Sequence, residues 1–253
     1  MMLTDEVGGS GWRMIGAQFK QLSRAGDFER SQTSFRFMLS GMKLHNYFRS
    51  SASYRVRIAL ELKGLAYEYI SVHIARGDHR QAAFAAVSAD TLVPLLEVDG
   101  EKLSQSMAIM EYLDAKFPNP PLLPADALGK AKVRALAQSI ACEMHPVNNL
   151  RVLKYLTKEL KVDEQTKNAW YVHWCREGLE AFERQLAQLP VSKFCYGGTP
   201  TMADCCLVPQ IFNAQRFKVS LNGLPRTMAA FEASAAMPAF QKAQPSACPD
   251  FEA

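Results

Sequence analysis

The sequence predicts an α/β region followed by an all-α region. Two observations predict this fold class: strand-like and helix-like segments alternate between Met42 and Pro118, and only helical periodicity follows from Leu128 onward. A proline-rich stretch, PNPPLLPAD, separates the two patterns and is typical of a domain boundary. We therefore expect one domain over residues 42–122 and an all-helical C-terminal domain over residues 127–253.

Composition restricts the class of protein. The chain has 253 residues and a net charge of +4 that is not gathered into basic blocks, which disfavours nucleic acid and leaves small anionic ligands open. No apolar run approaches the ~18 residues that span a bilayer, so we expect no membrane partner. The six cysteines lack the paired short spacings of a zinc site, so we expect no metal, and they form no disulfide framework. This pattern indicates a reduced, cytoplasmic protein.

Residues 1–41 differ from the rest of the chain. They combine glycines, mixed charge and no sustained period, and they end just before a second methionine, Met42. The stretch lacks the apolar core of a secretory signal, and it contains acidic residues that transit peptides avoid. We expect a disordered extension that can be removed without loss of activity.

The elements of the first region follow one another closely. KLHNYF predicts a strand, SASYRVRIALELKG a helix capped by Gly64, and AYEYISVHI a second strand. A short helix near residues 81–87 comes next, and VPLLEVDGEKL predicts a hairpin that turns at Asp99-Gly100. SQSMAIMEYLDAKFP predicts a helix that is capped at its start by Ser104 or Gln105 and ends at Pro118. The order β-α-β-α-β-β-α is the thioredoxin-like arrangement.

The second region reads as helices throughout. Long stretches with helical periodicity cover residues 128–160 and 163–189. Thr201 and Asp204 then have the spacing of an N-terminal capping box, in which a carboxylate reaches back to the first free N–H group of a helix.

Hydroxyl groups and positive charge gather at the start of the first helix. Ser50 and Ser51 lie between a strand and that helix, together with Arg49, Arg55 and Arg57. The free N–H groups and the positive dipole end of a helix favour an anion, and they lower the pKa of a nearby thiol. The pair is therefore either an ordinary N-cap or a site for a phosphate, carboxylate or thiolate.

Two other dipeptides fall in the same region. Val93-Pro94 opens a strand, where a proline belongs at an edge, a bulge or a cis turn, and a cis bond would leave the backbone free to pair with a peptide-like ligand. Gln105-Ser106 opens a helix and could hold a carboxylate, although capping alone also explains it. The three dipeptides occur at the spacing of one binding site.

These motifs carry a family resemblance. From Met42 on, the chain resembles the soluble glutathione transferases, in particular the zeta class that includes maleylacetoacetate isomerase and the bacterial maleylpyruvate isomerases. The resemblance rests on SSASYRVRIAL, Val93-Pro94, Gln105-Ser106, TMAD at residues 201–204 and RFKV at residues 216–219. One position departs from the zeta pattern, because Ala52 stands where a cysteine is usual. The related maleylpyruvate isomerases also lack that cysteine.

The resemblance implies a glutathione cofactor and a role for each motif. Ser50 would stabilise the glutathione thiolate with Ser51 nearby, and the Val93 backbone before Pro94 would pair with the glutathione backbone. Gln105 and Ser106 would hold the γ-glutamyl carboxylate of glutathione, and His79 would contact its glycyl end. His145 and Asn149 would approach glutathione from the second domain. The implied arginines for substrate carboxylates are Arg49, Arg151 and Arg216, because guanidinium groups pair well with carboxylates.

The resemblance also implies the reaction. We expect a glutathione-dependent cis–trans isomerase that converts maleylacetoacetate to fumarylacetoacetate, a small dicarboxylate substrate, in a homodimer. Three alternatives stay open: a maleylpyruvate isomerase of aromatic-acid degradation, a glutathione transferase acting on α-haloacids, and a non-catalytic glutathione-binding module.

Overall fold

The computed structural model of the protein describes residues 41–252, which form one compact unit. The expected disordered extension, apart from Gly41, lies outside the described residues and stays a prediction. Among the residues described, no helix is long and apolar enough to cross a membrane.

A four-stranded sheet organises the first part of this unit, in the spatial order β2-β1-β3-β4. β1 is parallel to β2, whereas β3 pairs antiparallel with both β1 and β4. The strands are β1 (Lys43–Asn46), β2 (Glu68–Ser71), β3 (Leu95–Val98) and β4 (Glu101–Ser104). Asp99 and Gly100 turn the β3–β4 hairpin with positive φ angles of 53° and 82°, as their sequence predicts. The expected βαβ unit with a closing hairpin is confirmed.

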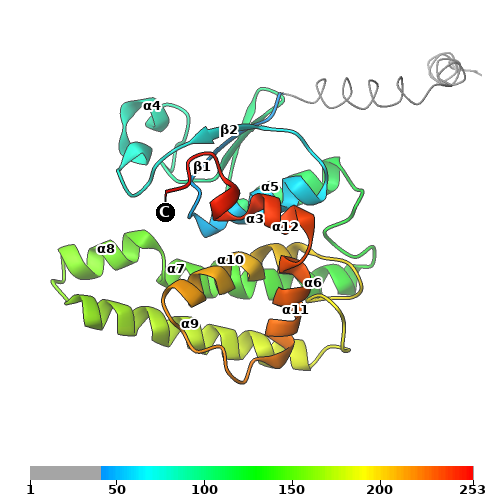
Figure 1. Ribbon diagram of the computed structural model, residues 1–253. Helices are drawn as coiled ribbons and strands as arrows, with labels where there is room; N and C mark the ends of the chain where they lie inside the picture. The colour runs from blue at the N-terminus through cyan, green and yellow to red at the C-terminus, as the bar shows by residue number, and fades with distance from the viewer. Residues whose placement is uncertain (1–40, 253) are drawn as a thin grey trace, which may run out of the picture. The chain divides into compact units, whose positions relative to one another are not determined.

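The helix that follows β1 is the centre of the molecule. α3 (Ser51–Leu62) lies between the sheet and the helices of the second part, as Figure 1 shows. It begins at Ser50, whose Oγ accepts a hydrogen bond from the Ser53 N–H at 3.2 Å, and it ends before Gly64, whose φ is 64°. Most of its residues are buried on all sides, so each polar side chain that it carries needs a partner inside the protein.

Three helical elements complete the first part. They are the 3₁₀ turn η1 (Asp78–Arg80), α4 (Ala82–Ala85) and α5 (Ser106–Lys116). Gln105 is the N-cap residue of α5, with a φ of 68°, but its side chain makes no capping hydrogen bond. The expectation that Ser104 or Gln105 caps this helix is confirmed for Gln105, although the Gln105 amide donates to Asp90 and does not bond to the helix.

The second part contains only helices, as predicted. They are α6 (Ala127–Gln138), the π-helical turn η2 (Ser139–Met144), α7 (His145–Val147), α8 (Leu150–Lys158), α9 (Glu164–Ala187), α10 (Met202–Arg216), α11 (Pro225–Ala235), α12 (Pro238–Ala243) and the 3₁₀ turn η3 (Pro245–Ala247). The periodic stretch over residues 128–160 is not one helix. Pro146 has no N–H group for the helical ladder, and the ladder widens to a π-turn just before it.

The start of α10 confirms the predicted capping box. The Asp204 carboxylate is fully buried and accepts the Thr201 N–H at 2.7 Å and the Thr201 hydroxyl at 2.9 Å. It also accepts the Cys195 N–H at 2.9 Å. One side chain thus joins the preceding loop to the helix that packs against α3.

The last described residues pack back onto the start of the chain. The Asp250 carboxylate accepts the Ser71 hydroxyl at 2.8 Å, the Phe48 N–H at 3.4 Å and the Tyr69 hydroxyl. Phe251 meets Phe48 edge to face, with ring centroids 5.6 Å apart. These contacts fix the loop between β1 and α3 from outside the sheet.

Candidate active site

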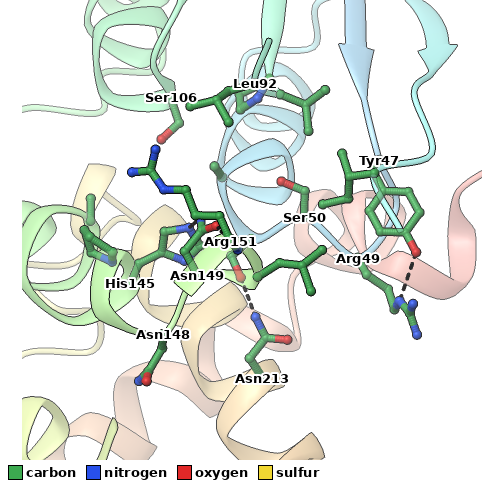
Figure 2. Close-up of a pocket in the computed structure, with 18 of the residues that line it drawn as sticks. Tyr47, Arg49, Ser50, Leu92, Ser106, His145, Asn148, Asn149, Arg151 and Asn213 are labelled. Carbon is green, nitrogen blue, oxygen red and sulfur yellow. Dashed lines mark hydrogen bonds between the residues drawn. The ribbon is translucent and has the colours of Figure 1, made fainter. Parts of the chain in front are cut away.

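One cavity of about 460 Å³ collects all the residues to which the family resemblance assigns a role at the site. The twelve are Arg49, Ser50, Ser51, His79, Val93, Pro94, Gln105, Ser106, His145, Asn149, Arg151 and Arg216. Figure 2 shows that Ser50, Leu92 and Ser106 face His145, Asn149 and Arg151 across this cavity. The site therefore lies between the sheet-bearing part and the helices, and its volume suits a small organic ligand.

The two serines at the start of α3 have defined hydrogen-bond roles. Ser50 Oγ accepts from the Ser53 N–H. Asn213 Oδ1 accepts from Arg216 Nη1 at 2.9 Å, and because a guanidinium can only donate, the Asn213 amide nitrogen must face Ser51 Oγ. Both serine oxygens thus accept within the protein, so both O–H groups remain available as donors to a ligand.

Ser106 at the start of α5 shows the same polarity. Its Oγ accepts from Arg55 Nη1 at 3.2 Å, which leaves its O–H group as a donor. Next to it, Gln105 Nε2 donates to Asp90 Oδ2 at 3.3 Å, so the amide is held across the rim of the cavity. Three hydroxyl donors and one oriented amide suit a ligand with several anionic oxygens or a thiolate.

The cavity is strongly cationic. Its basic lining residues are Arg49, Arg55, His79, Arg80, His145, Arg151, Lys154 and Arg216. Asp90 is the one carboxylate among the described lining residues. Burial and the guanidinium groups of Arg55 and Arg151 lower the pKa of His145 to about 3, so this imidazole is neutral at physiological pH. Such a site attracts anionic ligands.

The arginines at the head of α3 separate into different roles. Arg49 is exposed, donates to the Tyr47 hydroxyl at 3.2 Å and lies over the Phe48 ring. Arg57 is buried and donates to Asn46 Oδ1 and to three backbone carbonyl groups, so it holds the fold together and does not line the cavity. The position of Arg57 therefore does not support the expectation that it helps to attract an anion, because its N–H groups donate to Asn46 and to backbone carbonyl groups.

The helical side of the cavity contributes two linked residues. Asn149 Nδ2 lies 3.3 Å from His145 Nε2, and Asn149 Oδ1 caps α8 by accepting the Arg151 N–H at 3.1 Å. His79 lies on the opposite side, and its Nδ1 has no hydrogen-bond partner within residues 41–252. Burial and the nearby Arg80 lower the pKa of His79. The Val93–Pro94 peptide bond, which also lines the cavity, is cis, one of the possibilities that the sequence left open.

Sequence reasoning missed two residues of the site. Asp90 accepts a hydrogen bond from the Gln105 amide, and Asn213 donates one to Ser51, which lies 162 positions away in the chain. Neither residue belongs to a motif, and only the tertiary fold brings them to the cavity. No cluster of three or more potential metal ligands occurs within residues 41–252, and all six cysteines are free thiols.

Comparisons with known proteins agree with this fold and site. The family model "Glutathione S-transferase, N-terminal domain" matches residues 40–115, and "Glutathione S-transferase, C-terminal domain" matches residues 175–233. The chain belongs to the glutathione S-transferase family. Within it, the resemblance to the zeta class and its maleylacetoacetate and maleylpyruvate isomerases is confirmed.

The similar proteins cover nearly the same length. A maleylpyruvate isomerase from Ralstonia is 46% identical over 210 residues, which are 83% of this chain and 99% of that protein. A maleylacetoacetate isomerase from Pseudomonas aeruginosa is 43% identical over 212 residues, which are 83% of this chain and 98% of that protein. The holo structure of a bacterial zeta-class maleylpyruvate isomerase is 45% identical with a TM-score of 0.81, and covers 83% of this chain and 100% of its own. The structure of a glutathione-bound maleylacetoacetate isomerase from Anaeromyxobacter dehalogenans is 41% identical with a TM-score of 0.75, and the match covers 83% of this chain and 98% of that chain.

Proposed function

We propose that the protein is a glutathione-dependent cis–trans isomerase of maleyl compounds, with maleylacetoacetate as substrate and fumarylacetoacetate as product. The observation that carries this proposal is a cationic cavity whose three serines all present free O–H donors, in a chain of the zeta class. Glutathione supplies a thiol and two carboxylates, which are the groups that such donors stabilise.

The reaction needs an activated thiolate and a stabilised enolate. The glutathione thiolate adds to one carbon of the maleyl double bond, and the electron pair of that bond moves into the adjacent carbonyl group as an enolate. The former double bond is now single and rotates. The enolate then expels the thiolate, which restores the double bond in the trans form and leaves glutathione unchanged. The protein lowers the pKa of the thiol and stabilises the enolate charge.

The residues of the cavity divide between glutathione and substrate in this proposal. Ser50 donates to the sulfur at the N-terminus of α3, supported by Ser51. The remaining glutathione contacts are the Val93 backbone before Pro94, Gln105 and Ser106 at the γ-glutamyl carboxylate, His79 at the glycyl end, and His145 and Asn149 from the helical part. The substrate carboxylates meet Arg49, Arg151 and Arg216, all of which line the cavity.

Maleylpyruvate is the second candidate substrate. Two observations favour it: Ala52 replaces the zeta cysteine, and a maleylpyruvate isomerase is among the most similar relatives at 46% identity. The two candidates differ in the acyl chain beyond the maleyl group, so the distance to the arginines that hold the far carboxylate decides between them. We also propose that the protein is a homodimer and that it is located in the cytoplasm. Size-exclusion chromatography with light scattering directly tests the oligomeric state.

The test of the proposed function compares both substrates with and without glutathione. Isomerisation of maleylacetoacetate and of maleylpyruvate is followed by absorbance, with wild-type protein and with Ser50→Ala. We expect turnover only with glutathione and a loss of about 10²–10⁴-fold in kcat/KM in the variant, because a donor to the reacting atom is removed. The faster substrate identifies the physiological reaction. If glutathione binds but neither compound isomerises, the proposed function is wrong.

A further inference from the structure

Two aromatic residues support the exposed side chain of Arg49 at the cavity. Arg49 Nε donates to the Tyr47 hydroxyl at 3.2 Å, and its guanidinium carbon lies 5.3 Å from the centre of the Phe48 ring. Figure 2 shows this hydrogen bond beside Ser50. Ordering a long exposed side chain costs rotamer entropy, so its position depends on the neighbours that hold it. The position of Arg49 therefore depends on what holds Tyr47 and Phe48.

The guanidinium groups near Arg49 lack a counter-charge. No carboxylate of residues 41–252 forms a salt bridge with Arg49 or with Arg216. Burial and the nearby Arg49 lower the pKa of Arg216. Asp90, the one carboxylate among the described lining residues, bonds to Gln105 instead. Two such guanidinium groups favour an anionic group of the ligand in this part of the cavity.

The tail segment, which we define as Asp250, Phe251 and Glu252, packs against Phe48. The Phe48 side chain is buried, and its ring meets the Phe251 ring edge to face at 5.6 Å. The Phe48 N–H group donates to Asp250 Oδ2 at 3.4 Å. In Figure 1 the red end of the chain lies beside the end of β1. The Phe48 ring thus adjoins both Arg49 and the tail segment.

The tail segment reaches Tyr47 through His73. The Tyr47 ring is buried and lies edge to face with the His73 ring, with centroids 4.7 Å apart. His73 Nδ1 accepts the Arg76 N–H at 3.1 Å, so Nε2 carries the ring proton and donates it to Glu252 Oε2 at 3.3 Å. Glu252 also accepts from the Arg76 guanidinium. Both aromatic supports of Arg49 are therefore held by the tail segment.

We propose that the tail segment is a positioning element for Arg49, and that it strengthens the binding of a cis-dicarboxylate through Phe48 and Tyr47. The inference rests on the proposed function, since it takes Arg49 as a residue that binds a substrate carboxylate. Asp250 supports the loop backbone, whereas Phe251 and Glu252 act on the two rings. Replacement of the latter two separates the position of Arg49 from the support of the loop.

The test uses a ligand pair that binds without turnover. Maleate is the smallest cis-dicarboxylate of the maleyl type, and S-methylglutathione has a blocked sulfur that cannot add to it. Isothermal titration calorimetry gives the dissociation constant of S-methylglutathione alone, and then that of maleate in saturating S-methylglutathione. Thermal unfolding of each ligand-free protein controls for stability.

The variants leave the backbone anchor Asp250 in place. They are Glu252→Gln and the double substitution of Glu252→Gln with Phe251→Ala. The matched control is Glu177→Gln on α9, because Glu177 also lies within 3.4 Å of a histidine, His173, and its loss changes the net charge equally. Each tail variant is also made in an Arg49→Gln background.

The expected result is a loss confined to the dicarboxylate. The double variant weakens maleate about 3- to 10-fold, which corresponds to the ordering of one long side chain on binding, and Glu252→Gln alone weakens it less. S-methylglutathione changes by less than about twofold, as do both ligands in the exposed control Glu177→Gln. In the Arg49→Gln background the tail substitutions change maleate binding by less than about twofold, because the side chain that they position is gone. In isomerisation the loss appears in KM for the maleyl substrate and not in kcat.

Several outcomes overturn the inference. Wild type that does not bind maleate, or a double variant with unchanged maleate affinity, rejects it. Equal weakening of maleate and S-methylglutathione assigns the tail segment a structural role, and a full effect in the Arg49→Gln background shows that it acts on another residue. If the double variant does not fold, Glu252→Gln decides by the same criteria.

Failure of the proposed function is read separately. Wild type that binds maleate in a tail-dependent way but isomerises no maleyl compound rejects the proposed function and leaves the action of the tail segment on Arg49 in place. Wild type that isomerises maleyl compounds without any dependence on the tail segment rejects the inference alone.

Discussion

Asn213 offers a way to change the reactivity of bound glutathione without touching the ligand. Its amide nitrogen donates to Ser51 Oγ while its carbonyl oxygen accepts from Arg216. Replacement by Ala removes the donor, so the Ser51 hydroxyl is free to turn away from the sulfur. One neutral hydrogen bond contributes about 0.5–1.5 kcal/mol, and one pKa unit corresponds to about 1.4 kcal/mol. We therefore expect Asn213→Ala to raise the pKa of the bound thiol by about 0.4–1 unit.

A charge variant at the same position makes the test sharper. Asn213→Asp still accepts from Arg216 but cannot donate, so it draws the Ser51 proton toward its own carboxylate and also places negative charge near the sulfur. We expect a larger rise in the thiol pKa than with Ala. The ultraviolet absorbance of the bound thiolate, titrated against pH, measures both shifts, and the acidic limb of the activity profile moves upward with them.

The same measurement in a Ser51→Ala background tests the reasoning itself. If Asn213 acts through Ser51, its replacement has little further effect there, because the hydroxyl that it orients is gone. A full shift of the thiol pKa in the double variant would refute the proposed chain from Arg216 through Asn213 to Ser51. An unchanged pKa in all variants would show that Ser51 does not contact the sulfur.

The remaining predictions concern the structure around the site. Arg57→Met leaves three buried acceptors without a donor, because of its four acceptors only the Tyr47 carbonyl keeps another one, the Ser50 N–H. We therefore expect a loss of about 3 kcal/mol or more in urea unfolding, and an unchanged midpoint would contradict this role. Asp204→Asn cannot accept all the donors that the carboxylate satisfies, so we expect a loss of about 2–4 kcal/mol by the same method. His145 has a pKa of about 3 in the folded protein against 6.5 as its ordinary value, so the unfolded chain binds a proton that the folded one refuses. Relative to His145→Gln, wild type should therefore lose about 1–2 kcal/mol between pH 7 and pH 5; parallel pH dependences of the two proteins would exclude this.

Local signals in the sequence predict the fold well and the site only in part. Helix ends, the Asp99-Gly100 turn and the capping box at Thr201 and Asp204 depend on neighbouring residues, and the structure confirms them. The π-turn before Pro146 was missed, because a periodic pattern does not register a change from one helical ladder to another.

The arginines show why the rest could not be predicted. In the sequence, Arg55 and Arg57 are two similar residues near the start of one helix. Their difference arises from what packs on each face of α3: Arg57 meets the backbone of the β1–α3 loop and of α12, whereas Arg55 meets the cavity. Asn213 likewise reaches Ser51 only after α10 has packed against α3. Contacts between positions far apart in the chain carry no local signal.

The packing of the last described residues onto the β1–α3 loop has a consequence for synthesis of the protein. Ser50 is translated early, but the loop before it obtains its supports from Ala243, through Arg57, and from Asp250. The ribosome adds these residues almost two hundred positions later. The segment that carries the proposed thiolate site therefore stays incomplete on the nascent chain, and we expect the cavity to close only when the whole helical part has emerged.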